Sequence, residues 1–153
     1  MNFIIEKYNY EEAIFANKLL TKLILDEKQY DENINEKCTV RSLYEKFYNK
    51  EDICLYVTKY ENEIIGYIYG YIQNNGDAMK NTVCTLDALY VLEEYRNKGV
   101  TTELVNSFIK WCENNNAYYV ELKFCNLNKE AMQFYEKFDF LSKKTIMIKS
   151  IKR

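Results

Sequence analysis

Residues 95–104 read YRNKGVTTEL, and they join an apolar run to an amphipathic stretch. The preceding residues 82–91, TVCTLDALYV, are rich in β-branched and aromatic residues, which is typical of a strand. After Gly99, apolar residues recur at helical spacing through residues 100–116. The decapeptide is therefore predicted to be the turn between a strand and a helix, and such turns often bind anions.

Three residues of this turn suit an anion such as a pyrophosphate. A helix N-terminus presents unpaired N–H groups and a partial positive charge. Gly99 allows a positive φ and a close approach of the backbone to a ligand, while Arg96 and Lys98 neutralise negative charge. The alternative is an ordinary surface turn with solvated charges, which on the residues alone is the commoner case.

Length and composition indicate one ordered domain. Apolar residues make up 48% of the 153 residues and charged residues 29%, a balance typical of folded proteins. A chain of this length buries roughly two thirds of the surface that its unfolded form exposes, so one core suffices. Because no repeat, low-complexity tract or linker divides the chain, we predict a single domain over residues 1–153.

Charge and cysteine usage exclude several classes of protein. A net charge of −2 argues against a general affinity for nucleic acid, which needs clustered Lys and Arg. The five cysteines lie far apart without a C-x-x-C pair. The N-terminus lacks a secretory pattern, and no apolar run approaches the ~20 residues that cross a bilayer. We expect a cytoplasmic protein without disulfides or metal, and without nucleic-acid or membrane partners.

The remaining pattern predicts an α/β domain with a mixed central sheet. Strands are expected at residues 2–9, 53–60, 63–73, 82–91, 117–125 and 140–151, and helices at 10–28, 39–49, 100–116 and 128–138. The short link Glu61–Asn62 predicts an antiparallel hairpin. Residues 82–125 form a strand–helix–strand unit, whose strands should be parallel. We predict a sheet of about six to seven strands flanked by about four helices.

Two segments resemble the GCN5-related N-acetyltransferase (GNAT) superfamily. Its acetyl-CoA loop carries Arg/Gln-x-x-Gly-x-Gly/Ala after a strand that often ends in Leu-x-Val, and its late helix carries Asn-x-x-Ala-x-x-x-Tyr-x-x-x-Gly-Phe. The matching residues of LYVLEEYRNKGVT and NKEAMQFYEKFDF are Leu89, Val91, Arg96 and Gly99, then Asn128, Ala131, Tyr135 and Phe140. The element order matches the family over the whole chain, and the resemblance implies its single-domain α/β fold.

The chain departs from these motifs at two positions. Thr101 stands where the family has Gly or Ala, which places a β-branched side chain in the phosphate loop. Asp139 replaces the glycine after the late helix, where a left-handed conformation is usual and Asp is well tolerated. The first departure bears on cofactor binding and the second on local structure.

The resemblance implies transfer of an acetyl group from acetyl-CoA directly to a primary amine, without an acyl-enzyme. Backbone amides of one strand would hold the pantetheine and the thioester oxygen, amides of the turn would wrap the pyrophosphate, and one asparagine would bond the pantetheine arm. The matching positions are Leu89, Tyr90 and Val91 in the strand, Arg96, Asn97, Lys98, Gly99, Val100 and Thr101 in the turn, and Asn128.

Two residues match positions at which the resemblance implies side chains that transfer protons. Tyr135 stands where the family has the tyrosine that donates a proton to the departing thiolate, although a tyrosine on an inward helical stripe also suits a core. Asp87 shares a strand face with Leu89 and Val91 if side chains alternate, so it could accept the amine proton or bind a cationic substrate. A solvated or salt-bridged Asp87 is the alternative.

The acceptor in such folds enters across the first helices and the hairpin. Here that region is acidic and aromatic, with Asp26, Glu27, Asp31, Glu32 and Glu36 near the segment GYIYGYIQ. These groups suit a small cationic amine, although charged connections between helices are more often solvated surface. The alternatives to an enzyme are a non-catalytic GNAT-like CoA-binding or regulatory module and a domain for another phosphorylated ligand. The resemblance is also compatible with a homodimer formed through late strands.

Overall fold

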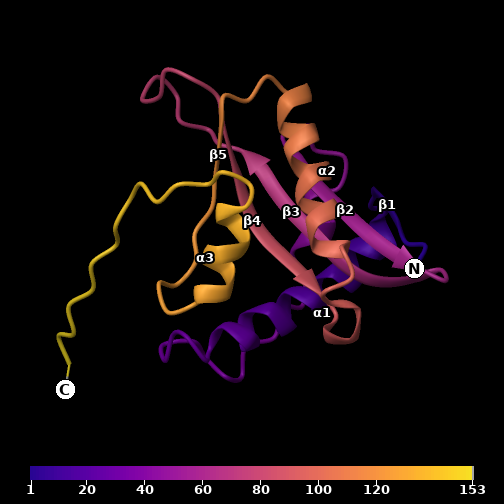
Figure 1. Ribbon diagram of the computed structural model, residues 1–153, viewed down its shortest axis with the longest axis horizontal. Coiled ribbons are helices and arrows are strands. Elements are labelled where there is room, and N and C mark those ends of the chain that lie inside the picture. Colours follow the sequence, from indigo (N-terminus) through magenta and orange to yellow (C-terminus); the bar gives the residue numbers. More distant parts are fainter. Residues whose placement is uncertain (153) are drawn as a thin grey trace. The chain divides into compact units, whose positions relative to one another are not determined.

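The computed structural model describes residues 1–152, which divide into two compact units. The first unit ends at Lys123 and the second begins at Phe124. The first holds a sheet with two long helices, and the second holds one short helix (Figure 1). The elements of the first unit are β1 (Ile4–Lys7), α1 (Tyr10–Glu27), the 3-10 turn η1 (Tyr44–Phe47), β2 (Ile53–Tyr60), β3 (Glu63–Ile72), β4 (Val83–Val91), the 3-10 turn η2 (Glu93–Tyr95), α2 (Val100–Asn114) and β5 (Tyr119–Glu121); the second unit has α3 (Lys129–Glu136).

The sheet is mixed, and its order is β1-β2-β3-β4-β5. The first four strands pair antiparallel, whereas β5 pairs parallel to β4. Glu61 and Asn62 connect β2 to β3 with φ values of 51° and 68°, as a tight two-residue hairpin turn requires. The predicted hairpin and the predicted parallel strand–helix–strand unit are both confirmed.

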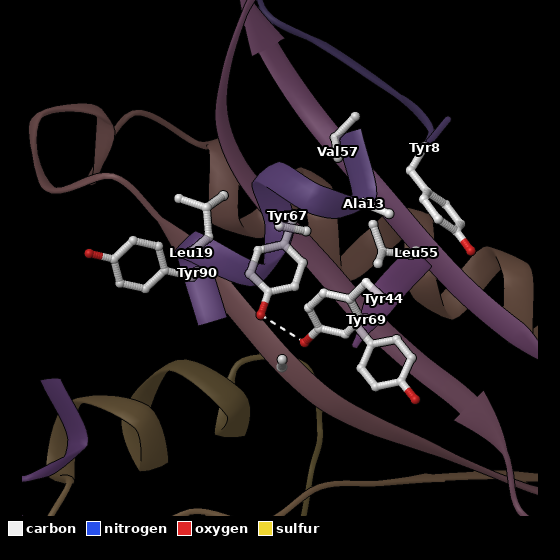
Figure 2. Close-up of a cluster of buried hydrophobic side chains, with 11 residues drawn as sticks. Tyr8, Ala13, Leu19, Tyr44, Leu55, Val57, Tyr67, Tyr69 and Tyr90 are labelled. Carbon is white, nitrogen blue, oxygen red and sulfur yellow. Dashed lines mark hydrogen bonds between the residues drawn. The ribbon is translucent and has the colours of Figure 1, made fainter. Parts of the chain in front are cut away.

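The two long helices cover opposite faces of the sheet (Figure 1), and Figure 2 shows the buried side chains on the α1 face. Helix α1 begins with a capping box between Asn9 and Glu12 and buries Ala13, Ala16 and Leu19 against the sheet. The sheet side of this core is formed by Leu55, Val57, Tyr67, Tyr69, Ala88 and Tyr90. Helix α2 buries a stripe on the other face, formed by Val100, Leu104, Val105, Phe108 and Cys112. Apolar residues at helical spacing explain both contacts.

The number of elements predicted from the sequence is wrong. The described sheet has five strands and not six to seven, and the described residues contain three α-helices and not about four. Residues 39–49 form only η1, because side chains capture the backbone donors that a helix would use. The amide of Leu43 donates to the Glu45 carboxylate, and the amide of Tyr44 donates to Asn17 Oδ1.

The predicted strand at residues 140–151 is also absent from the described residues. Its alternating pattern favours an extended chain, but a strand forms only against a neighbour that supplies hydrogen bonds. Here the apolar side chains of Leu141, Met147 and Ile148 are exposed. The alternating pattern therefore identifies a segment that is suited to a strand, although no strand forms there in the described residues.

Gly70 on β3 is required by close packing. A Cβ at this position would overlap the backbone oxygen of Thr85 and the ring of Phe108. We expect Gly70→Ala to lower the free energy of unfolding by about 2 to 3 kcal/mol, as overpacking does, measured by urea denaturation. Gly76→Ala is the matched control, because Gly76 has a φ of 53° and open space around it, so only backbone strain of about 1 kcal/mol applies. Equal losses in the two variants would show that the contact does not constrain residue 70.

Buried tyrosines make the fold sensitive to alkali. Tyr44 and Tyr67 are buried and share a hydrogen bond of 2.9 Å between their hydroxyls. Burial raises the pKa of both phenols, and it raises the pKa of Tyr8 to about 12 from a model-compound value of 10.0. A raised folded-state pKa stabilises the native state fully below pH 10, and this contribution is lost as the pH rises toward the folded pKa.

The protein should therefore unfold cooperatively above about pH 10, with the increase in phenolate absorbance coinciding with the loss of circular dichroism. Tyr44→Phe removes one of these groups and should move the midpoint to higher pH. Phenolate formation in a protein that stays folded would contradict the expectation.

Candidate functional site

The strand β4 leaves the parallel ladder after its first three residues. Val83, Cys84 and Thr85 pair with β5, and β4 then continues to Val91 with no partner strand on that side among residues 1–152. Backbone amides that point to this side are therefore available to a ligand. The residues predicted to hold pantetheine, Leu89, Tyr90 and Val91, all lie on this free segment.

A β-bulge places Asp87 in this region. The β3–β4 register pairs Tyr69 with Ala88 and Gly70 with Leu86, so Asp87 is the extra residue. The bulge interrupts the alternation of side chains, and the expectation that Asp87 shares a face with Leu89 and Val91 is wrong for this reason. The charge of Asp87 instead acts on the α1 face of the sheet, where it raises the pKa of Tyr67 and Tyr69.

The turn after β4 has the conformation that its glycine predicts. Gly99 has a φ of 86° and Asn97 a φ of 60°, and a Cβ on Gly99 would meet nothing within 4 Å. Helix α2 begins at Val100, and its first hydrogen bond runs from Glu103 N to Gly99 O at 3.1 Å. The amides of Val100, Thr101 and Thr102 come before Glu103 in the chain, so they donate no hydrogen bond within the helix. Residues 96–99 are exposed, which fits an anion site open to solvent.

The guanidinium of Arg96 is held close to its own strand. Its Nε donates to the Val91 carbonyl at 2.8 Å, and its Cζ lies 5.1 Å from the centroid of the Tyr90 ring. Its Nη2 lies 3.5 Å from Asp26 Oδ2 at the end of α1. These contacts fix the turn against the end of β4. Arg96 therefore supports the turn with its side chain, in addition to any contact that its backbone makes.

Asp87 lies near the acidic end of α1. Burial raises the pKa of Asp87, and the nearby Lys123 partly opposes that rise. Burial is the largest cause that raises the pKa of Glu27, and the negative charges of Asp31, Asp87 and Asp26 raise it further. The negative charge of Asp87 thus acts on Glu27, one of the acidic residues predicted to meet the acceptor, as do the charges of Asp26 and Asp31. Glu36 pairs with Lys28 at 3.1 Å.

Two further predicted residues belong to the second unit. Asn128 caps α3, since its Oδ1 accepts a hydrogen bond from the amide of Ala131 at 3.0 Å. Tyr135 is half-buried in an aromatic cluster, with ring centroids 6.2 Å from Phe124, 5.1 Å from Phe134 and 5.6 Å from Phe140. Burial raises the pKa of Tyr135, so its phenol is protonated at neutral pH. After α3, Asp139 has the left-handed φ of 65° that was expected.

The tyrosines of the segment that the sequence analysis associated with the acidic residues form an aromatic wall on the α1 face of the sheet. The rings of Tyr67, Tyr69 and Tyr71 come from alternate residues of β3, and those of Phe47 and Tyr69 stack with centroids 5.7 Å apart. The alternation in the segment GYIYGYIQ explains this wall, because side chains two residues apart point to the same face of a strand. Sequence reasoning missed the bulge at Asp87, since the bulge depends on the register of two strands.

Other kinds of site have no counterpart in the described part of the chain. No group of three or more His, Cys, Asp or Glu side chains there is arranged to hold a metal ion. All five cysteines are free thiols. None of the helices within residues 1–152 has the length and apolar character needed to cross a bilayer.

Comparisons with known proteins agree with this geometry. The family model described as "Acetyltransferase (GNAT) family" matches residues 20–140. A tetramutant of the BH1408 protein from Bacillus halodurans has a similar structure, with a TM-score of 0.81, 17% identity, and coverage of 97% of this chain and 99% of that one. No curated protein sequence matches the chain.

Two acetyltransferase structures are also similar. An aminoglycoside acetyltransferase from an uncultured soil metagenomic sample has a TM-score of 0.74 and 13% identity, and covers 99% of this chain and 96% of its own. Glucosamine-6-phosphate N-acetyltransferase from Arabidopsis thaliana has a TM-score of 0.69 and 18% identity, with 99% and 100% covered. At these identities the likeness shows the fold, whereas the family model spans most of the sequence. The chain belongs to the GNAT acetyltransferase family.

Proposed function

We propose that this protein is an acetyl-CoA-dependent N-acetyltransferase that transfers the acetyl group directly to a primary amine of a small cationic molecule. The observation that supports this most strongly is the free segment of β4 that leads into the open turn at Gly99. A strand with unused amides followed by a helix N-terminus suits a ligand with an amide-rich arm and a diphosphate.

The residues of the first unit fit this cosubstrate. Amides of Leu89 to Val91 would bond the pantetheine arm and the thioester oxygen, and amides of residues 96–101 would surround the diphosphate. Gly99 leaves open space where the phosphates would approach. Lys98 adds positive charge, while Arg96 holds the turn in place through Val91 and Tyr90. When bound, acetyl-CoA supplies an activated acyl group, and the protein supplies position and proton transfers.

Asp87 and Tyr135 suit the two proton transfers of the reaction. An attacking amine must lose a proton, and a carboxylate whose pKa is raised by burial is a better acceptor than an ordinary one. The departing sulfur must gain a proton, and Tyr135 keeps its own at neutral pH. We assign Asp87 as the group that accepts the amine proton or holds the cationic acceptor, and Tyr135 as the acid.

The charge around Asp87 supports a cationic acceptor. Asp26, Glu27 and Asp31 add negative charge at the end of α1, and the stacked rings of Phe47 and Tyr69 offer an aromatic surface. Two proteins of similar fold are named as acetyltransferases of an aminoglycoside and of glucosamine 6-phosphate. Both names are consistent with an amine as the acceptor here.

A non-catalytic CoA-binding or regulatory module is the second candidate. Thr101 favours it, because this half-buried β-branched residue lies in the first turn of α2 where the family has Gly or Ala. Release of coenzyme A in the presence of a broad panel of amines separates the two candidates. Turnover with any amine supports the enzyme, and tight binding of coenzyme A without turnover supports the module.

The turn at Gly99 gives a specific test of cofactor binding. We expect Gly99→Ala to weaken binding of coenzyme A about tenfold in calorimetry, because the backbone conformation that points amides at the phosphates becomes strained. Gly76→Ala introduces the same strain at an open site with positive φ, and it should leave the affinity unchanged. Equal affinities in all three proteins would place the diphosphate elsewhere.

Replacement of Tyr135 tests its assignment as the acid. We expect Tyr135→Phe to lower kcat by about 100-fold or more, since a positioned acid contributes that much, while phenylalanine preserves the packing with Phe124 and Phe140. Tyr118→Phe is the control, because Tyr118 is 67% exposed and should leave kcat unchanged. Thiol release from acetyl-CoA measures both. A Tyr135→Phe enzyme as fast as wild type would remove Tyr135 from the mechanism.

A further inference from the structure

A groove lies between the edge strand β1 and helix α2. The side chains that line it come from β1, β2 and α2 and include Ile5, Lys7, Tyr56, Asn106, Ser107 and Lys110. Leu55 and Val57 belong to the core under α1, so Tyr56 between them points to the α2 face of the sheet. Lys7 lies opposite Tyr56 in the β1–β2 pairing and shares that face. The groove is therefore on the α2 face, and it uses none of the residues assigned above to the acyl donor or the acceptor.

Two lysines in this groove have no acidic partner. Lys7 and Lys110 are exposed and make no salt bridge within the described residues. Glu6 also borders the groove, but its carboxylate accepts a hydrogen bond from Lys59 Nζ at 2.5 Å. One lysine on an edge strand is a common protection against pairing with another chain. The second lysine comes from a helix and is not part of that edge, so the groove has an excess of positive charge in a chain whose net charge is −2.

The open edge of β1 offers backbone groups beside these lysines. β1 is at the end of the sheet order, and no described strand pairs with its outer edge (Figure 1). The amide of Tyr8 donates to Leu55 O at 3.2 Å. Because bonded and non-bonded pairs alternate along antiparallel strands, Glu6 also bonds to β2. The amides and carbonyls of Ile5 and Lys7 therefore point away from β2. The two β1 residues that place side chains in the groove are thus the ones whose backbone is free to pair.

We propose that the β1 edge and this groove bind an extended acidic segment of another protein, which adds an antiparallel strand beside β1. The backbone of the segment pairs with Ile5 and Lys7, and its alternate side chains reach the groove, where carboxylates meet Lys7 and Lys110. The side-chain amide of Asn106 is a further donor to a carboxylate. This surface is independent of the proposed acetyl transfer, because the proposed acceptor site is on the α1 face of the sheet.

The combination of charge and backbone favours a peptide over a small anion. A free phosphate or carboxylate can meet the two lysines, but it leaves the amides and carbonyls of Ile5 and Lys7 without partners from the protein. Interactions of exposed lysines with such an anion are also weak and are screened by salt. An acidic strand satisfies the lysines and the open edge together, so it accounts for both features of the surface.

Calorimetry with synthetic peptides tests the role of charge. The probe is a seven-residue peptide of alternating glutamate and valine with blocked ends, and its counterpart has glutamine in place of glutamate. We expect the acidic peptide to bind saturably, and the glutamine peptide to bind about tenfold more weakly or less. The double variant Lys7→Gln/Lys110→Gln should weaken binding of the acidic peptide about tenfold.

The matched control is the double variant Lys22→Gln/Lys80→Gln, which removes the same charge at two exposed lysines outside the groove. It should leave the affinity for the acidic peptide unchanged. Equal effects of the two double variants, or no binding of the acidic peptide by folded wild type, would overturn the proposal.

Amide hydrogen exchange tests the backbone pairing separately. With the acidic peptide bound, exchange should slow at Ile5 and Lys7, because their amides gain acceptors, and change little at Glu6 and Tyr8, whose amides bond to β2. Methylation of the glutamate nitrogens of the peptide should abolish binding, since these face β1 in an antiparallel pair, and methylation of the valine nitrogens should not. Unchanged exchange at Ile5 and Lys7, or the same slowing with inorganic phosphate alone, would overturn the added strand.

Discussion

The early end of the β4–β5 ladder is the constraint on which the rest of the first unit depends. Hydrogen bonding stops at Thr85, yet β4 continues to Val91 through its pairing with β3. The strand is thus held rigidly on one side and is open on the other. A ligand that bonds to backbone amides requires both conditions, because a mobile strand would lose its ordering entropy on binding.

The elements around this strand stabilise its open side without covering it. Phe108 of α2 packs where β3 has only Gly70, which brings the helix close to the sheet. Arg96 ties the turn to the Val91 carbonyl and to the Tyr90 ring. The bulge at Asp87 then turns a carboxylate toward the tyrosines of the α1 face. The packing of Phe108, the contacts of Arg96 and the bulge at Asp87 each fix one part of β4 or of its neighbour β3. The proposed thioester site and the proposed amine site therefore both adjoin β4.

Local patterns were sufficient to predict much of this arrangement. The hairpin at Glu61–Asn62, the parallel unit around α2 and the positive φ of Gly99 each depend on a few adjacent residues. The bulge at Asp87 depends on the register between two strands, which no single segment encodes. The loss of the helix at residues 39–49 depends on Asn17 and Glu45, which are 28 positions apart. The contacts of Arg96 with Asp26 bridge an even longer separation. Long-range hydrogen bonds and pairing therefore explain what the sequence pattern missed.

Amide chemical-shift mapping with coenzyme A tests the open edge of β4 most directly. Isotopically labelled protein titrated with coenzyme A should show its largest shifts at Leu89, Val91, Gly99, Val100 and Thr101, since their amides would exchange water for the ligand. The amides of β1, on the opposite edge of the sheet, should not move. Saturable binding that leaves the first group unshifted, or no binding at all by folded protein, would contradict the assignment of this edge as the site of the acyl donor.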